Sequence, residues 1–320
     1  MGDIDGATGS WGFARGGMGS ISRALAAALC EAGGEIRTDA EIERFLVKDG
    51  RIEGVALASG EEVRARVVAS NMDVKRTFLG CMDPADLPDD FLAGVRRFRI
   101  RGSSAKINLA LDALPDFPAA PEGAGFLAGD LHASESLLEL ERAYDDWKDG
   151  RWSAEPYFDM LIPSLIDPTM APPGRHMMTL FIQYAPYALE RDGVASGENW
   201  DDVARDALRD AVFDKIEGVS PGFRNHVLHA EIRTPRDLER EVGLTEGNIF
   251  QGELSLDQLL FNRPVPGWAQ YRSPIRGLYL VGSSAHPGGG VMAAPGANAA
   301  REILRDAGRL RRGARAFRAA

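Results

Sequence analysis

The residues most able to do chemistry lie late in the chain, in the glycine-rich run GSSAHPGGGVMAAPGANAA at 282–300. The run follows the apolar stretch GLYLV and leads into an alanine-rich segment with a helical pattern. The consecutive glycines 288–290 remove side chains over a stretch long enough for a planar ring or a phosphate to lie against the backbone. Free N–H groups at a helix start also favour negative charge. The run therefore predicts a cofactor loop, with tight packing of the loop on the helix as the alternative.

A second glycine motif lies near the N-terminus, where Gly17-x-Gly19-x-x-Ser22 opens a helical pattern and Asp39 follows 20 positions after Gly19. This arrangement imitates the dinucleotide-binding fingerprint. Serine replaces the third glycine, however, and WGFAR is a poor buried strand. A glycine turn that starts a helix is the simpler interpretation.

Other residue patterns offer little chemistry. His226 and His229 have only Glu231 near them in the sequence, so we expect no metal site. No G-x-S-x-G elbow surrounds Ser283 or Ser284, which argues against a hydrolase nucleophile. No acid or base stands out, and the sequence predicts no particular catalytic residue.

Composition and charge narrow the class of protein. The 320 residues are 44% hydrophobic with a net charge of -10, which predicts a folded protein and argues against nucleic acid as a partner. Two cysteines, Cys30 and Cys81, indicate no disulfide framework and favour a cytoplasmic location. No apolar stretch approaches the roughly 20 residues of a membrane helix. A mitochondrial matrix location, or peripheral contact with a membrane, is the alternative.

Periodicity predicts the elements that must position these residues. Residues 19–38 indicate a helix, a glycine stop and a strand. Residues 40–71 alternate between apolar and polar in runs that are broken at Asp49-Gly50 and Ser59-Gly60. This pattern is typical of an antiparallel meander, and it closes with a buried strand, RVVASN. The apolar GLYLV strand needs sheet neighbours of the same kind. We therefore assign residues 1–100 and 270–320 to one domain.

The middle of the chain has a different pattern. KINLALDAL and MMTLFIQYA indicate strands, whereas HASESLLELERAYDDWKDG and NWDDVARDALRDAVFDKIEGV indicate amphipathic helices. Proline-rich turns such as MAPPGRH separate them. Residues 101–269 are therefore predicted to form an α+β domain inserted into the first.

Several of these segments resemble a known family. GGMGSISRALAAAL, the meander, and GLYLVGSSAHPGGGVMAAPGANAA are similar to the phytoene-desaturase-like flavoprotein oxidoreductases, which include amine-oxidase-like enzymes. WGFARGGMG, SLIDPTMAPPG, FIQYAPY, NIFQGELSLDQL and SAHPGGGVM resemble a narrower group within that family. The resemblance covers essentially the whole chain, as roughly the C-terminal two thirds of such a protein, whose main dinucleotide fingerprint lies at its beginning.

The resemblance implies FAD bound to an α/β domain of the glutathione-reductase type, with the inserted α+β substrate domain over the flavin. Gly16 and Gly17 would approach the cofactor, and Ile42 would meet the adenine through its backbone. The residues that would line the flavin and the adjoining phosphates are Gly282, Ser283, His286, Pro287, Gly288, Gly289, Gly290 and Val291. The helix from about Ala293 would direct its positive end at them.

One departure from the family is large. Nothing before Gly16 resembles the family's strand, G-x-G-x-x-G and helix, so the α/β domain is expected to be partial and to lack its N-terminal βαβ unit. A truncated gene product, half of a split enzyme and an expressed fragment are the alternatives. We expect either an N-terminal half on a separate chain or self-association through an exposed sheet edge.

The activity implied by the resemblance is hydride transfer between flavin and an organic, apolar small-molecule substrate. A cleft for such a substrate would be walled by Phe181, Tyr184, Tyr187, Phe250, Leu260 and Phe261, with ordinary core packing as the alternative. Lys106 and Gln183 are polar residues on apolar strands that would orient the substrate or simply face solvent. The alternative function is a non-catalytic ligand-binding or scaffold protein derived from the same fold.

Overall fold

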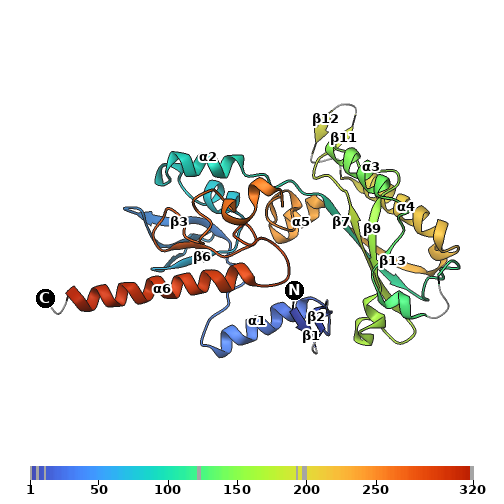
Figure 1. Ribbon diagram of the computed structural model, residues 1–320, viewed down its shortest axis with the longest axis horizontal. Coiled ribbons are helices and arrows are strands. Elements are labelled where there is room, and N and C mark those ends of the chain that lie inside the picture. The colour runs from blue at the N-terminus through green and yellow to red at the C-terminus, as the bar shows by residue number, and fades with distance from the viewer. Residues whose placement is uncertain are drawn as a thin grey trace. The chain divides into compact units, whose positions relative to one another are not determined.

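The chain folds as two units with separate cores, each assembled from segments that are distant in the sequence. A computed structural model describes residues 2–4, 7–10, 12–120, 124–191, 194–196 and 200–317. Unit 1 comprises residues 1–36 and 102–241, and unit 2 comprises residues 37–101 and 242–320. In the colours of Figure 1, unit 2 combines the light-blue segment 37–101 with the orange-to-red segment 242–320.

These units divide the chain differently from the boundaries predicted above. Residues 1–36 belong to unit 1, where the backbone N–H of Gly16 donates to Oδ2 of Asp167 at 2.6 Å. Residues 242–269 belong to unit 2, because Arg263 within this segment bonds to the backbone of the glycine-rich loop, as described below. Both differences arise from contacts over long sequence separations, which local patterns do not contain.

Unit 1 is built on a five-stranded antiparallel sheet with the strand order β13-β7-β10-β9-β8. Its strands are β7 (Ser104–Leu111), β8 (Leu131–His132), β9 (Tyr157–Leu161), β10 (His176–Gln183) and β13 (Val227–Arg233). The strands predicted at KINLALDAL and MMTLFIQYA are confirmed as β7 and β10, which pair along their whole lengths.

Helices cover one face of this sheet (Figure 1). They are α3 (Leu137–Lys148) and α4 (Asp202–Val219), at the two positions that the amphipathic patterns predicted. Alternate residues of β7, such as Ile107 and Leu109, are buried with Leu208 and Val212 of α4 in one core. The intervening strand residues lie on the other face of the sheet, in keeping with the two-residue period of a strand.

The other elements of unit 1 are short, apart from the first helix. Helix α1 (Gly19–Glu31) confirms the predicted N-terminal helix, whereas the strand predicted after Gly34 does not form, and α5 (Pro235–Val242) follows β13. Two hairpins complete the set: β1 (Gly2–Ile4) pairs with β2 (Ala7–Ser10), and β11 (Leu189–Arg191) pairs with β12 (Val194–Ser196).

Unit 2 begins with the predicted antiparallel meander of β3 (Ile42–Lys48), β4 (Arg51–Leu57) and β5 (Glu62–Arg64). The β3–β4 turn lies at Asp49 and Gly50, which have φ values of 50° and 67°. A two-residue turn with both residues in this region matches the right-handed twist of the strands it joins. The sequence break predicted at Asp49-Gly50 is therefore the hairpin turn.

The remainder of unit 2 packs on a second, parallel pair of strands, β6 (Val68–Ser70) and β14 (Leu278–Leu280). Helices α2 (Asp89–Arg97) and α6 (Ala294–Phe317) and a π-helical turn at Arg76–Gly80 accompany them. Val74, Phe78, Phe91 and Val95 are almost completely buried in the core of this unit. The strands predicted at RVVASN and GLYLV are thus neighbours, and the glycine-rich run follows β14.

Candidate functional site: a glycine-rich loop supported by a buried arginine

The glycine-rich loop (residues 281–293) runs from the carboxyl end of β14 to the start of α6. Ligands of parallel α/β sheets bind at the carboxyl ends of the strands, so the loop lies at the edge where a cofactor is expected. Helix α6 has no acidic residue in its first turn, which leaves the positive end of its dipole uncompensated.

Two glycines of the loop lie where no side chain fits. A Cβ atom built on Gly282 would be 2.4 Å from the carbonyl oxygen of Asn71, and one built on Gly289 would be 2.5 Å from Cδ1 of Phe250. Gly288 and Gly290 have φ values of 110° and 126°, which residues with side chains rarely adopt. The four positions therefore require glycine for geometric reasons.

The loop also presents polar atoms without partners. The backbone N–H groups of Gly289, Gly290 and Val291 donate no hydrogen bond within the described part of the chain. Nδ1 of His286 is buried and likewise has no partner among the described residues. Consecutive free N–H groups favour phosphate or another anion, and buried polar atoms normally find a partner. The residues present therefore fit a cofactor that combines a planar ring with phosphates.

A buried arginine is hydrogen-bonded to the backbone of the glycine-rich loop. Arg263 is completely buried, and its Nε donates to the carbonyl oxygen of Ser283 at 2.9 Å. Its other donors reach four backbone carbonyl oxygens of the preceding segment, those of Phe250 at 2.8 Å, Glu253 at 3.1 Å, Gly252 at 3.3 Å and Gln258 at 3.4 Å. One side chain thus ties the glycine-rich loop to residues 250–258.

The charge of Arg263 is not neutralised by a carboxylate among the residues that the structure describes. Burial lowers the pKa of its guanidinium to about 10. A buried charge is costly unless hydrogen bonds compensate it, and here backbone carbonyls supply that compensation. The backbone of the loop is therefore hydrogen-bonded to a side chain that carries a fixed positive charge.

Ser284 adds a second tie between the same segments. Its buried hydroxyl donates to the carbonyl oxygen of Gln251 at 2.6 Å and accepts from the N–H of Val74 at 3.1 Å. The sequence argues against Ser284 as a nucleophile and predicts no role for Arg263. An arginine between apolar residues in LLFNRPVPGW was the available signal for Arg263, because charged residues are seldom buried without a specific partner.

The remaining residues predicted to contact the cofactor are distributed over both units. Ile42 begins β3 in unit 2, and its carbonyl oxygen lies 3.8 Å from Sγ of Cys81. Gly16 and Gly17 precede α1 in unit 1, with φ values of 78° and 84°. Val291 is 76% exposed, so its side chain is available to a ligand. A common contact of these groups with one cofactor stays a prediction.

Two of the polar residues predicted to orient a substrate lie on the same face of the unit 1 sheet, opposite the helices. Lys106 is directly across from Phe181 in the register of β7 and β10, and Gln183 is two residues further along β10. Lys106 is an exposed residue, but desolvation by the surrounding atoms and then the nearby charge of Arg233 lower the pKa of its ammonium group. The sheet therefore brings Lys106, Phe181 and Gln183 together, as a substrate surface requires.

The two predicted tyrosines are engaged in other contacts. The Tyr184 ring makes an edge contact with Tyr144 of α3, with the ring centroids 5.3 Å apart. The hydroxyl of Tyr187 donates to Glu239, and the Arg236 guanidinium lies 4.7 Å from the centroid of its ring. Each of these tyrosines has a packing or hydrogen-bonding role within unit 1.

The structure also assembles a polar cluster that the sequence did not predict. Asp130, His132 and Asp159 have ligand atoms within 4.8 Å of one another, where the edge strand β8 and the residue before it meet the neighbouring strand β9. Nδ1 of His132 lies 2.9 Å from both Asp159 and the Tyr157 hydroxyl. The register of two strands brings these residues together, and their spacing along the chain gives no sign of it.

Residues 3–304 match the family of flavin containing amine oxidoreductases. The chain belongs to this family. Family membership implies a flavin cofactor, and the loop stays the predicted place for it. Among the residues that the structure describes, no helix is long and apolar enough to cross a membrane.

Curated relatives confirm the resemblance at family level. The chain is 44% identical over 313 residues to "pyridine nucleotide-disulfide oxidoreductase domain-containing protein 2" of Rattus norvegicus, covering 96% of this chain and 53% of that protein. It is 29% identical over 286 residues to "4,4'-diapolycopene oxygenase" of Methylomonas sp, covering 88% of this chain and 52% of the relative. The chain thus spans about half the length of these relatives.

A solved structure shares the fold. An oxidoreductase from Methanosarcina mazei matches this chain with a TM-score of 0.58 and 19% sequence identity. The match covers 91% of this chain and 55% of that protein. At this identity the likeness concerns the fold alone, which is the mixed α/β fold of flavin oxidoreductases.

Proposed function

We propose that the chain is the flavin-loop and substrate-sheet part of an FAD-dependent oxidoreductase that moves a hydride between an apolar organic substrate and the flavin. The observation that carries the proposal is the row of free N–H groups at Gly289, Gly290 and Val291, which a flavin nucleotide would satisfy. Bound flavin supplies a hydride acceptor, and the protein supplies orientation and the exclusion of water.

An apolar substrate is supported by side chains near the loop. Four apolar side chains of unit 2 are exposed: Leu254 (44%), Phe261 (74%), Val291 (76%) and Met292 (53%). Leu254 lies close to the loop, because its Cδ2 would be 3.5 Å from a Cβ atom on Gly288. Exposed apolar side chains beside a binding loop are typical of a hydrophobic binding surface.

Further residues are needed to complete the flavin site. The described parallel sheet of unit 2 has two strands, whereas parallel sheets are normally larger and covered on both faces. We propose that a further segment, on the same or a separate chain, or a second copy, supplies the remaining flavin contacts. Two free cysteines support a reducing compartment such as the cytoplasm.

Titration of the purified chain with FAD, followed by flavin fluorescence and absorbance, tests the proposal. We expect saturable binding that weakens when Gly288, Gly289 and Gly290 are all replaced by alanine. A matched control replaces Gly80, which has open space around its Cα, by alanine. Oxidation of apolar amines and of polyenes would then be assayed with the flavin-loaded protein.

Absence of binding under these conditions would be followed by a second titration. In it, a recombinant N-terminal βαβ segment from one of the longer relatives is added to the chain. Recovery of FAD binding would support a site completed by another segment. No recovery, combined with saturable binding of an apolar ligand, would instead favour the non-catalytic binding protein.

A further inference from the structure

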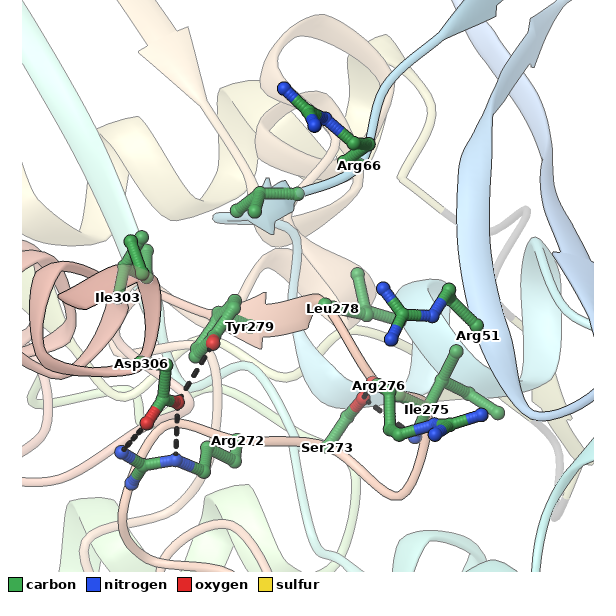
Figure 2. Close-up of a pocket in the computed structure, with 13 residues that line it drawn as sticks. Arg51, Arg66, Arg272, Ser273, Ile275, Arg276, Leu278, Tyr279, Ile303 and Asp306 are labelled. Atoms are coloured by element: carbon green, nitrogen blue, oxygen red, sulfur yellow. Dashed lines mark hydrogen bonds and ion pairs between the residues drawn. The ribbon is translucent and has the colours of Figure 1, made fainter. Parts of the chain in front are cut away.

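A second candidate site lies at the opposite end of β14 from the glycine-rich loop. It is a pocket of about 340 Å³ bordered by β4, the segments before β6 and β14, and helix α6 (Figure 2). Part of the wall is apolar and is formed by Val67, Ile275, Leu278, Ile303 and Ala307. Pockets for small organic ligands start at roughly 300 Å³, so this one suits a small molecule and is too small for a dinucleotide.

Arginines surround the mouth of this pocket. Arg51, Arg66 and Arg276 line it, and none of the three lies within 4.0 Å of a carboxylate in the part of the chain that the structure describes. The chain as a whole carries a net charge of -10, so carboxylates are abundant elsewhere. Unpaired arginines gathered at one pocket therefore need a reason.

The backbone holds two of these arginines side by side. The N–H of Ile52 donates to the carbonyl oxygen of Arg276 at 3.0 Å, and the N–H of Arg276 donates to that of Gly50 at 2.9 Å. These bonds place Arg51 and Arg276 opposite each other, where like charges repel. Figure 2 shows the two side chains on one side of the pocket, while Arg66 stands apart from them.

Gly277 makes this close arrangement feasible. A Cβ atom at this position would lie 2.7 Å from the carbonyl oxygen of Arg66 and 2.8 Å from Cγ2 of Ile52, and its φ is 88°. The glycine thus lets three chain segments that carry the arginines converge. Backbone contacts of the fold therefore bring these segments together, whereas flexible surface side chains can come near one another without any such constraint.

The charged side chains on the opposite wall of the pocket are already paired with one another. Arg272 is paired with Asp306 at 2.8 Å and with Glu302 at 2.6 Å, and the Tyr279 hydroxyl donates to Asp306 at 2.9 Å. These bonds fix the wall. The Arg276 guanidinium donates to the carbonyl oxygen of Asp49 at 3.3 Å, a bond that leaves its charge unneutralised, so Arg51 and Arg276 can both attract an anion. The pocket therefore offers apolar contact on its inner surface and two guanidinium groups at its rim.

We propose that this pocket binds an amphipathic organic anion, in which a phosphate or carboxylate group meets Arg51 and Arg276 while an apolar body occupies the cavity. Guanidinium groups recognise both oxyanions through paired hydrogen bonds. The flavin loop follows the carboxyl end of β14, whereas these arginines lie at its amino end, so the two sites are separate on the strand. The proposal is independent of flavin binding.

Isothermal titration with octyl phosphate tests the proposal, with inorganic phosphate and octanol as partial ligands. We expect saturable binding of octyl phosphate that weakens with added salt, and weaker binding of both partial ligands. Arg51→Gln and Arg276→Gln should each weaken it by on the order of tenfold. Arg51→Lys, which keeps the charge and loses the paired geometry, should have an intermediate effect.

Arg64→Gln is the matched control, because it removes the same charge from a neighbouring exposed arginine that is paired with Glu53 and Glu62. We expect its affinity to stay within about twofold of the unaltered protein. Equal weakening by this variant would overturn the proposal, as would the absence of saturable binding or equal affinity for octanol. Thermal unfolding of each variant verifies that the fold is retained.

A vesicle experiment distinguishes the two sources of such an anion. Sedimentation with phosphatidylcholine vesicles containing phosphatidic acid, lost in Arg51→Gln, would assign the pocket to a lipid headgroup. Binding of octyl phosphate without vesicle association would assign it to a free metabolite of the same chemistry. Vesicle association that persists in Arg51→Gln and Arg276→Gln, without binding of octyl phosphate, would contradict the proposal.

Discussion

Nε of Arg263 donates a hydrogen bond of 2.9 Å to the carbonyl oxygen of Ser283, across 20 residues of sequence. This bond joins a completely buried cation to the loop that carries the predicted flavin contacts. It makes the geometry of the loop depend on a residue that lies outside the glycine-rich run. The consequences can be measured with and without flavin.

Arg263→Met should destabilise unit 2 strongly. The substitution removes the Arg263 donor from five buried or partly buried carbonyl oxygens, of which that of Glu253 keeps a bond from Nε2 of Gln258. At roughly 1 to 3 kcal/mol for each unsatisfied buried group, partly relieved by relaxation, the free energy of unfolding should fall by about 3 kcal/mol or more. Urea denaturation gives this value, and hydrogen exchange at residues 282–290 reports the freedom of the loop.

Arg263→Lys separates the charge from the geometry. Lysine keeps a cation but cannot span all the carbonyls that the planar guanidinium reaches. We expect partial stability, faster exchange in the loop and weaker FAD binding than in the unaltered protein. Exchange in the loop as slow as in the unaltered protein would show that Arg263 does not position it.

Gly289→Ala should disturb the loop through a clash alone. The added Cβ would lie 2.5 Å from Cδ1 and 3.0 Å from Cα of Phe250, and a ring next to its own backbone has little room to move. We expect at least a tenfold loss of FAD affinity, with a smaller loss of stability, by fluorescence titration. Gly80→Ala, with open space at its Cα, should leave the affinity unchanged.

Asp237 should make unit 1 sensitive to acid. Burial raises the pKa of its carboxyl, but hydrogen bonds from Arg205 and Thr234 outweigh that effect and hold the pKa at about 2. Because the folded pKa lies below the unfolded value near 4, the stabilisation is present above about pH 4 and is lost as pH falls toward 2. The difference between the folded and unfolded pKa values corresponds to about 2 kcal/mol in the free energy of unfolding.

Denaturation of Asp237→Asn across this pH range checks that expectation. The variant should be less stable than the unaltered protein at pH 7, and the difference should shrink as the pH falls. Asp206→Asn serves as the control, because Asp206 pairs with Arg209 on the exposed surface of α4. A constant difference between pH 7 and pH 2 would show that Asp237 does not titrate as stated.

Lys106→Met should raise thermal stability slightly. Desolvation by the surrounding atoms and, as a smaller effect, the positive charge of Arg233 lower the pKa of Lys106. The folded state therefore disfavours the charged form of this lysine. A lowered lysine pKa means that stability increases as pH rises through the folded pKa, and removal of the charge has the same effect at pH 7. Lys148→Met is the comparison: Lys148 is paired with Asp145, so its loss should leave stability unchanged or slightly lower.

Local patterns were enough to predict most elements of this fold. The Asp49-Gly50 turn, the apolar run of β14 and the amphipathic period of α4 each leave a signature within a few residues. The same holds for the glycine-rich loop, because glycine is the residue that a close approach to backbone requires. The family could also be predicted, since its motifs are local segments of sequence.

What surrounds the loop could not be predicted in the same way. Arg263 reaches Ser283, and Gly277 lets the backbone at Arg66 lie against the chain beside Arg276, only because distant segments fold together. An arginine in a sequence gives no sign of whether its charge is solvated, paired with a carboxylate or buried against carbonyls.

The sequence by itself therefore determined the family, many of the longer helices and strands, and the glycine-rich loop that suits a flavin. Only the tertiary structure decided which residues support that loop, which part of the chain belongs to each unit, and where unpaired arginines gather. The physical reason is range: backbone propensity and glycine geometry act between near neighbours, whereas burial and charge pairing depend on contacts between segments far apart in the chain.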